Sequence, residues 1–450
     1  MNRTKTWLVT AMAAVPLLTV SACGSGGGEA TAGSDSDVTT IDYWLWDANQ
    51  QPAYQQCADA FAADNPGLAV EITQRGWDDY WATLTTGFQS DTAPDVFTDH
   101  LSKYPEFVQN NVLLPLDDVV PDIDTDQYAP GLAELWVAQD GKRYGLPKDW
   151  DTVALFYNKE MAEAAGITEE EMQNLTWNPN DGGTYEDVIA KLTVDENGKR
   201  GDEAGFDKTK VAVYGLGLPG SGGANGQTEW SYFTQTTGWT HTDENPWGTS
   251  YNFDDPRFQE AIAWWKGLID KGYMPALETT VGASMNDNFG AGKSAINANG
   301  SWMIGSYAGY EGVELGIAPT PVGPSGERAS MFNGLADSIF AGTDDKEAAG
   351  KWVAFLGSAE CQDLVGKAGV VFPAIQSGID EAKKAFEAKG VDVTAFTQHV
   401  EDGTTFLFPI TDHASDINAI MSPAMDAVLS GTADVESLTA ANDQVNALFQ

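Results

Sequence analysis

Basic residues are scarce in this sequence. Lys and Arg together number 24 against 66 Asp and Glu, so the formal net charge is −42. A surface of this sign repels the phosphates of nucleic acids and the head groups of anionic lipids, which excludes both as direct partners. The acidic residues are spread along the chain rather than gathered in a tail, so they predict a solvating exterior.

Cysteine and histidine are also few, at three and four residues. No CxxC pattern is present, and His100, His241, His399 and His413 have no metal-ligand spacing around them, so we expect neither a metal nor a cofactor. Apart from Cys23, the chain has Cys57 and Cys361. From the residues alone, a disulfide and two separately buried thiols are both open.

A long hydrophobic run is missing as well. The apolar stretch "WLVTAMAAVPLLTV" is broken by Pro16 and is too short for a convincing membrane span. With Arg3 and Lys5 before it, it predicts an export signal over residues 1–22. Ser21 and Ala22 before Cys23 are typical of a bacterial lipobox, in which the thiol of Cys23 receives an acyl chain such as palmitate. The alternative is an ordinary secretory signal that is cleaved nearby.

Residues 23–37 are rich in Gly, Ser, Ala, Thr and Asp and cannot form a core. We predict a flexible tether, since about fourteen such residues have a root-mean-square span of roughly 20 Å. The protein would then be held at the outer face of the cell membrane by lipid alone. The acidic, Ala/Asp/Gly-rich composition suggests a Gram-positive host.

Apolar strands alternate with helices in the following segment. "VTTIDYWLWD", "LAVEITQ" and "PDVFTDH" predict strands, separated by helical stretches that begin near residues 50 and 78. This alternation indicates an α/β fold with a mostly parallel sheet, whose ligands gather beyond the carboxyl ends of the strands. The side chains at those ends are Trp46, Asp47, Trp77, Asp78, Asp99 and His100.

Catalytic signatures are weak. Gly215, Gly217 and Gly220 have GxGxxG spacing, but Pro219 and the polar residues that follow predict a loop instead of a nucleotide-binding helix. "DIDTDQ" lacks the turn glycine of a calcium loop. Carboxylate pairs are too numerous for a glycosidase dyad to be identified or excluded.

An ordered set of blocks gives the chain its resemblance. A lipobox with a Gly/Ser tether, "IDYWLWD", "YPEFVQNNVLLPLDD", "YGLPKDWDTVALFYNKEMAEAAGI", "FGAGKSAINANGSW" and "GIAPTPVG" occur in this order. The chain resembles the family 1 extracellular solute-binding lipoproteins of bacterial carbohydrate ABC importers. The resemblance implies a two-lobed, periplasmic-binding-protein-like α/β fold with crossing hinge strands and a ligand cleft. It suggests lobe one at 38–151 and 319–371, lobe two at 152–318 and 372–450, and a stronger case for the Cys57–Cys361 pair, which falls in one lobe.

Sugar rings present an apolar C–H face and polar hydroxyls, so a sugar site needs aromatic rings beside amides and carboxylates, and charged acceptors make the stronger hydrogen bonds. From the first lobe this logic and the family pattern favour Trp46, Asp47 and Trp77, with Asp99, Lys148 and Asp149 on the floor and Trp150 close by. From the second lobe they favour Trp230, Trp239, Asn299 and Trp302, and from the returning strand Asn333. Each residue also has a structural alternative, such as Asp47 as a helix cap.

The resulting prediction is a monomeric, non-enzymatic binding protein that captures a sugar, most simply an oligosaccharide, by lobe closure and delivers it to the membrane permease of an importer. Two alternatives stay open. One is an extracellular glycosidase, which would cleave its substrate. The other is a binding protein for a non-sugar solute such as a polyamine or a peptide.

Overall fold

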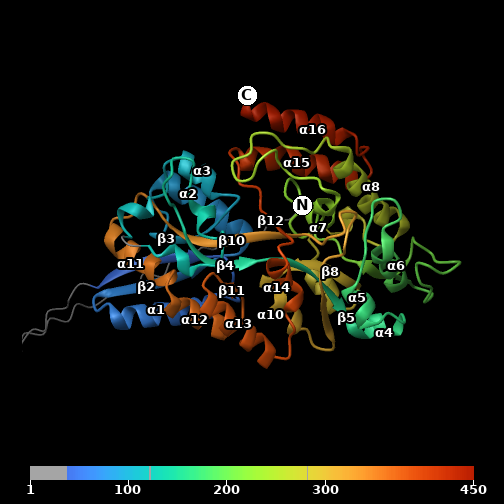
Figure 1. Cartoon of the computed structure of the whole chain (residues 1–450), viewed down its shortest axis with the longest axis horizontal. Helices are drawn as coiled ribbons and strands as arrows, with labels where there is room; N and C mark the ends of the chain where they lie inside the picture. Colours follow the sequence, from blue (N-terminus) through green and yellow to red (C-terminus); the bar gives the residue numbers. More distant parts are fainter. Residues whose placement is uncertain (1–37, 121–122, 281) are drawn as a thin grey trace, which may run out of the picture. The chain divides into compact units, whose positions relative to one another are not determined.

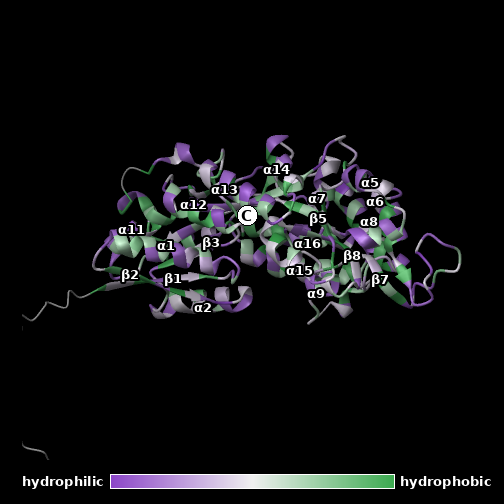
Figure 2. Cartoon of the chain, turned by 90° about the horizontal axis from the view of Figure 1, so that it is seen from below, coloured by the Kyte–Doolittle hydropathy of each residue, from purple (hydrophilic) through white to green (hydrophobic). Residues whose placement is uncertain are grey.

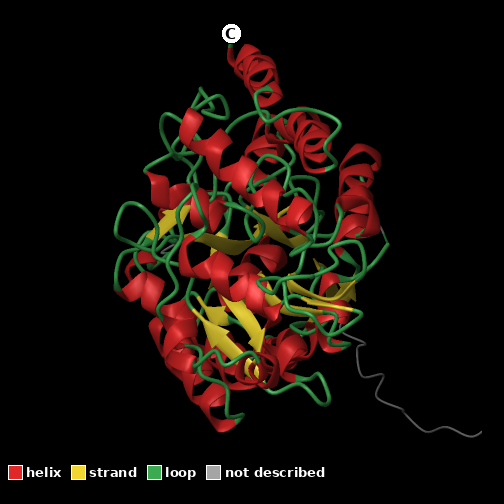
Figure 3. Cartoon of the chain, turned by 90° about the vertical axis from the view of Figure 1, so that its right-hand side faces the viewer, coloured by secondary structure: helices red, strands yellow, loops and turns green. Residues whose placement is uncertain are grey.

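The computed structural model describes residues 38–120, 123–280 and 282–450 (Figure 1). The predicted signal peptide, Cys23 and the tether lie outside the described residues. Within the described ranges, no helix is both long and apolar enough to cross a membrane. Residues 38–450 form one compact unit. In Figure 3 the strands lie inside this unit, and helices and loops surround them.

The first of two sheets has the strand order β11-β4-β10-β3-β1-β2, with β12 paired to β10. Its strands are β1 (Thr39–Leu45), β2 (Leu68–Gln74), β3 (Val96–His100), β4 (Leu146–Asp151), β10 (Ser330–Ile339), β11 (Phe372–Pro373) and β12 (Thr405–Leu407). The part built from β2, β1 and β3 is parallel, as the strand–helix alternation predicts. β10 and β11 add antiparallel pairs, so the sheet is mixed.

The second sheet has the order β6-β7-β8-β5-β9. Its strands are β5 (Val153–Asn158), β6 (Val194–Asp195), β7 (Val211–Leu216), β8 (Ser294–Gly300) and β9 (Leu315–Ala318). In Figure 2, β5 and β7 carry mainly hydrophobic residues, while hydrophilic residues gather on the outer helices and loops. This pattern agrees with the predicted acidic, solvating exterior.

Two groups of helices cover the sheets and contribute to two hydrophobic clusters, here called the first core and the second core. The first core includes side chains from α1 (Gln51–Asp64), α2 (Trp77–Ser90), α3 (Tyr104–Gln109), α9 (Met285–Gly290), α10 (Ile304–Ala308), α11 (Lys346–Leu356), α12 (Ala359–Ala368), α13 (Gln376–Ala388) and α14 (Thr394–Glu401). The second core includes side chains from α4 (Lys159–Ala164), α5 (Glu169–Gln173), α6 (Gly183–Leu192), α7 (Ser231–Thr234), α8 (Pro256–Lys271), α15 (Ala414–Leu429) and α16 (Ser437–Asn446).

The chain passes from one sheet to the other at defined points. Thr152 alone separates β4 from β5, and the segment after β9 returns the chain to β10. Every residue of β4, β5 and β10 is buried. In Figure 1, β4, β10 and β12 lie side by side in the middle of the molecule, in agreement with their pairing. These are the crossing strands that the family resemblance implies.

One predicted boundary differs from the structure. The family resemblance suggests that everything after residue 371 belongs to lobe two, but β11 pairs with β4 and α13 packs on α12. Side chains between Phe372 and Ile410 belong to the first core, and the second core resumes only in α15. The short β11 extends the first sheet and holds α13 against it, while α14 contacts β5 of the second sheet.

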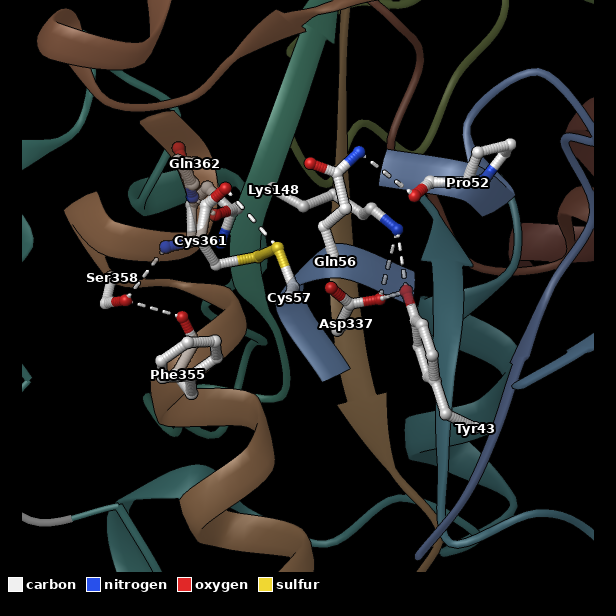
Figure 4. The surroundings of a disulfide bond; sticks show 11 residues. Tyr43, Pro52, Gln56, Cys57, Lys148, Asp337, Phe355, Ser358, Cys361 and Gln362 are labelled. Carbon is white, nitrogen blue, oxygen red and sulfur yellow. Dashed lines mark hydrogen bonds and ion pairs between the residues drawn. A yellow bond between two sulfur atoms is a disulfide. The ribbon is translucent and has the colours of Figure 1, made fainter. Parts of the chain in front are cut away.

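Cys57 on α1 and Cys361 on α12 form a disulfide, and both are fully buried (Figure 4). The bond joins two helices of the first core that are 304 residues apart in sequence. The other possibility, two separate thiols, is therefore not realised. Because it closes so long a loop, the disulfide restricts the unfolded chain strongly.

Candidate functional site

A cavity of about 410 Å³ lies where residues of the two sheets meet. The ends of β1, β3 and β4, the start of α2 and the middle of β10 supply one side, and the 3-10 turn Ser301–Met303 after β8 supplies the other. Of the predicted site residues, those that line the cavity are Trp46, Asp47, Trp77, Asp149, Trp150, Trp302 and Asn333. The carboxyl ends of the parallel strands therefore lie at the cavity, as expected for an α/β sheet.

Aromatic rings form the first component of the site. The rings of Trp46 and Trp77 meet edge to face with centroids 5.1 Å apart, and Trp46 also packs on Tyr80 and Trp81 of α2. The side chain of Trp77 is 44% exposed, which is a large fraction for a tryptophan. An exposed ring at the cavity wall, held in place by its neighbours, provides a stacking surface at little cost in side-chain entropy.

Trp302 stands on the opposite side of the cavity. Its ring lies against the Cα of Gly300, and a Cβ at that position would overlap it. The motif "NGSW" therefore has a physical basis: the glycine ends β8 and leaves room for the indole to fold back. The ring then faces the cavity together with Ser301 and Met303.

Polar groups form the floor. Asp151 accepts hydrogen bonds from Gln227 Nε2 at 2.9 Å and from Asn333 Nδ2 at 3.2 Å. Asn333 Nδ2 also lies 3.1 Å from His100 Nε2. Asp149 Oδ2 and Asn333 Oδ1 are buried and have no hydrogen-bond partner among the described residues. Such groups are costly unless a ligand satisfies them, which makes them natural contacts for one.

Asp47 closes the turn between β1 and α1. Its carboxylate accepts hydrogen bonds from the backbone N–H of Asn49 at 2.8 Å and from Gln50 Nε2 at 3.0 Å. The side chain thus holds the loop that carries the cavity wall while also facing the cavity. Asp47 is not the helix cap considered as its structural alternative, because the N-cap position of α1 is Gln50 and has no side-chain cap hydrogen bond.

Lys148 and Asp99 lie beneath the floor and do not line the cavity. Lys148 Nζ donates to Tyr43 Oη and Thr98 Oγ1, each at 2.8 Å, and lies 3.4 Å from Asp337 Oδ1 (Figure 4). Asp99 accepts hydrogen bonds from the N–H of His100 and from Ser338 Oγ. Asp149, Trp150 and Asp151 of β4 line the cavity, whereas Lys148, where the pairing of β4 with β10 shifts in register, does not.

Burial governs the charge state of these groups. Loss of solvation raises the pKa of Asp149 to about 7 and that of Asp99 to about 8, and the same cause raises the pKa of Asp151 well above its usual value. Burial also lowers the pKa of His100 to about 3, so this ring is neutral at physiological pH. The floor is therefore a desolvated acidic surface.

Three predicted residues lie elsewhere. Trp230 and Trp239 are fully buried in the second core, where their indole N–H groups donate to the carbonyl oxygens of Ser221 and Asn252. Asn299 Nδ2 donates to Asn286 Oδ1 within a polar group around Tyr307. The prediction that these three line the cleft does not agree with their placement, because their polar atoms already have partners inside the protein.

Other residues take their place. Gln227, from the loop before α7, reaches Asp151, and His100, Asn49 and Gln50 complete the wall. Asp151 was missed although strand alternation in "KDWD" would have paired it with Asp149. Nothing in the local sequence around Gln227 indicates that its loop folds back over the cavity.

A second cavity of about 700 Å³ adjoins the first and shares Trp77, His100 and Gln227 with it. The glycine-rich loop from Ser221 to Glu229 and the start of α15 line it. The two cavities therefore share a wall, and this wall carries the exposed indole of Trp77.

The comparison with known families decides the class of this site. A model of the bacterial extracellular solute-binding protein family matches residues 56–390, well over half of the chain. The chain belongs to this family. The resemblance seen in the sequence is thereby confirmed at family level, and the family comprises binding proteins of the cell exterior.

Several similar proteins align with nearly the whole of this chain. A maltooligosaccharide ABC transporter solute-binding lipoprotein of Streptococcus pneumoniae is 25% identical, covering 98% of this chain and 96% of its own. Mycobacterium tuberculosis UspC is 26% identical with a TM-score of 0.69, covering 91% of this chain and 99% of its own. An ABC substrate-binding protein of Listeria monocytogenes in complex with cycloalternan is 20% identical with a TM-score of 0.77, covering 92% and 99%. The last likeness shows the shared two-domain fold.

Proposed function

We propose that this protein is the substrate-binding component of an ABC importer and that it captures a sugar in the cavity between the two sheets. The observation that carries the proposal is the combination of four tryptophans with carboxylate and amide groups around one cavity. Indole rings match the C–H face of a pyranose, and the buried oxygens of Asp149 and Asn333 match its hydroxyl groups.

The size of the site supports an oligosaccharide. Pockets for small ligands have volumes of about 300–1,000 Å³. The first cavity of about 410 Å³ continues into a second of about 700 Å³, which leaves room for several sugar rings in a row. The S. pneumoniae relative carries maltooligosaccharide in its name, and the Listeria structure contains cycloalternan.

Capture would proceed by closure of two lobes around the sugar. Hydrogen bonds already join the two sides, since Gln227 Nε2 donates to Asp151 and Asn49 Nδ2 donates to Ser306 Oγ at 3.3 Å. A ligand favours closure only through contacts that it gains in the closed form, and Trp302 facing Trp46 and Trp77 would supply them. The closed form is then what the permease recognises, and no chemistry on the sugar is needed.

The same proposal includes the membrane anchor. Residues 1–22 would be removed as a signal peptide, the thiol of Cys23 would carry the lipid, and the tether would hold a monomeric binding domain at the outer face of a Gram-positive cell membrane. The sequence around Cys23 supports this part, and radiolabelled palmitate tests it. Label should enter the full-length protein and not its Cys23→Ser variant.

The experiment that tests the function is calorimetric titration of residues 38–450, which form their own compact unit, against a panel of oligosaccharides. We expect micromolar or tighter binding of one sugar that is recovered intact. Recovery of cleaved sugar would instead support a glycosidase. Binding of a peptide or a polyamine in place of every sugar would move the protein to another solute class.

A further inference from the structure

The first cavity is lined by more acidic than basic side chains. Three carboxyl groups line it, those of Asp47, Asp149 and Asp151. None of the described residues that line it is Lys or Arg, and the His100 ring is neutral. Burial raises the pKa of Asp149 to about 7 and that of Asp151 well above its usual value, so the ionised forms of these carboxyl groups are costly unless a cation lies beside them.

The nearest buried cation, Lys148, acts to lower the pKa of Asp149 but does not line the cavity. Lys148 lies beneath the floor, where its ammonium group contacts Tyr43, Thr98 and Asp337 and lies 3.8 Å from the centre of the Tyr54 ring. Asp337 and Asp99 add two further buried carboxyl groups behind the cavity. The charge of Lys148 is thus used within the first core.

The three carboxyl groups are not equivalent. Asp47 and Asp151 accept hydrogen bonds from neutral protein groups at both of their oxygens. Asp149 is 3% exposed, and its Oδ2 has no partner among the described residues. This carboxylate oxygen of a cavity-lining residue therefore lacks a donor among the described residues, and a charged donor would satisfy both its hydrogen bond and its charge.

The surrounding rings favour the same type of ligand. Trp46 and Trp77 on one side and Trp302 on the other border the space beside Asp149. The face of an indole attracts a cation, with the strongest effect where water is excluded. Burial raises the pKa of Asp149 to about 7, so a cation next to it would also hold the carboxyl group in its ionised form.

We propose that the ligand is a saccharide that carries a protonated amino group, and that this ammonium group binds to Asp149. The inference rests on the proposed sugar-binding function. It favours one amine rather than a polyamine, because Asp149 is the one carboxyl group of the described cavity lining with an unpartnered oxygen, while Asn49, Gln50, Gln227 and Asn333 offer amides for hydroxyl groups. The amine selects the sugar, and the tryptophans bind its rings.

The test uses matched sugars that differ only in their amino groups. Residues 38–450 are titrated at pH 7 with glucosamine, galactosamine, mannosamine and the β-1,4-linked glucosamine disaccharide. Each is compared with the parent sugar that has a hydroxyl group instead and with the N-acetylated form. We expect at least one amine to bind tenfold or more tightly than both of its neutral partners.

Two variants assign the effect to its residue. Asp149→Asn keeps the shape of the side chain and should reduce the preference for the amine over its neutral partners to less than threefold. Asp59→Asn, at an exposed position of α1, removes the same charge far from the cavity and should leave the preference unchanged. Thermal unfolding checks that both variants fold. If Asp149→Asn does not fold, the comparison of amino sugars with their neutral partners on the unaltered protein is the test.

Three outcomes would overturn the inference, and they differ in what else they affect. Equal binding within every set, or a preference that survives Asp149→Asn, would overturn it while leaving the sugar-binding function intact. Binding of spermidine with no binding of any sugar would overturn the inference and the proposed function together.

Discussion

Lys148 Nζ lies 3.4 Å from Asp337 Oδ1, and the two side chains are only 2% and 1% exposed. The pair joins β4 to β10, the two neighbouring strands that lie under the cavity. A buried ion pair of this kind does not by itself prove stability, but removing one partner leaves the other charge without compensation. Lys148 therefore supports the floor of the site from below instead of meeting the ligand.

We expect Lys148→Met to lower the free energy of unfolding by about 3–5 kcal/mol, because it leaves Asp337 buried beside no cation. The matched control is Lys351→Met, which breaks a surface pair with Glu347 on α11. Exposed pairs contribute about 0–1 kcal/mol. Urea denaturation measures the free energy of unfolding of both variants. Equal decreases in the two variants would show that the buried pair contributes no more to stability than the surface pair.

The pH dependence of stability should carry the signature of Asp149. Burial raises its pKa from 3.8 to about 7, opposed by the charge of Lys148 and reinforced by Asp337 and Asp47. Between these two pH values the folded protein keeps a proton that the unfolded chain has lost. Unfolding therefore releases a proton, and the stability that this group contributes falls as the pH rises through this range.

Asp149→Asn removes that contribution. Relative to the unaltered protein, the variant should become more stable from pH 4 to pH 7, by at most about 1.4 kcal/mol per pH unit. Denaturation curves at a series of pH values test this. Two proteins whose stabilities run parallel across the range would contradict the prediction.

Trp77 should matter for binding far more than for folding. Its ring is 44% exposed and borders both cavities. We expect Trp77→Ala to weaken binding of the cognate sugar about tenfold or more, equivalent to about 1.4 kcal/mol or more, with a small change in melting temperature. Tyr214→Ala, a half-buried aromatic on β7 outside both cavities, is the control and should bind normally. A similar loss of affinity in both variants would argue against a stacking role for Trp77.

The glycines of the GxGxxG segment should differ in their tolerance. A Cβ at Gly215 would overlap the carbonyl oxygen of Ile189 on α6, whereas nothing lies within 4 Å of a Cβ at Gly220. Gly215→Ala should therefore cost about 1–3 kcal/mol of stability by forcing β7 away from α6. Gly220→Ala should change it by less than about 0.5 kcal/mol. Thermal unfolding compares them, and equal tolerance would mean that β7 and α6 adjust freely.

Much of the fold could be predicted because its signals are local. Helix α8 ends at Lys271, just before Gly272, which has the positive φ of 79° that a helix stop of this type requires. Strand–helix alternation around β1, β2 and β3 placed Trp46, Asp47 and Trp77 at one edge of a sheet. The later boundary could not be found in this way, because β11 has only two residues and its pairing with β4 is not local.

The α/β class, the family, the excess of acidic residues and the half of the site that follows the strand ends can be predicted from the residues alone. Periodicity, charge and motif order are properties of neighbouring residues, so they need no three-dimensional information. Folding of the whole chain is what places some tryptophans at the cavity and others in the second core. It also pairs Lys148 with Asp337, brings Gln227 to Asp151 and leaves an oxygen of Asp149 without a partner among the described residues. These outcomes depend on contacts between segments far apart in the chain, where the available hydrogen-bond partners, rather than residue type, determine the role of a side chain.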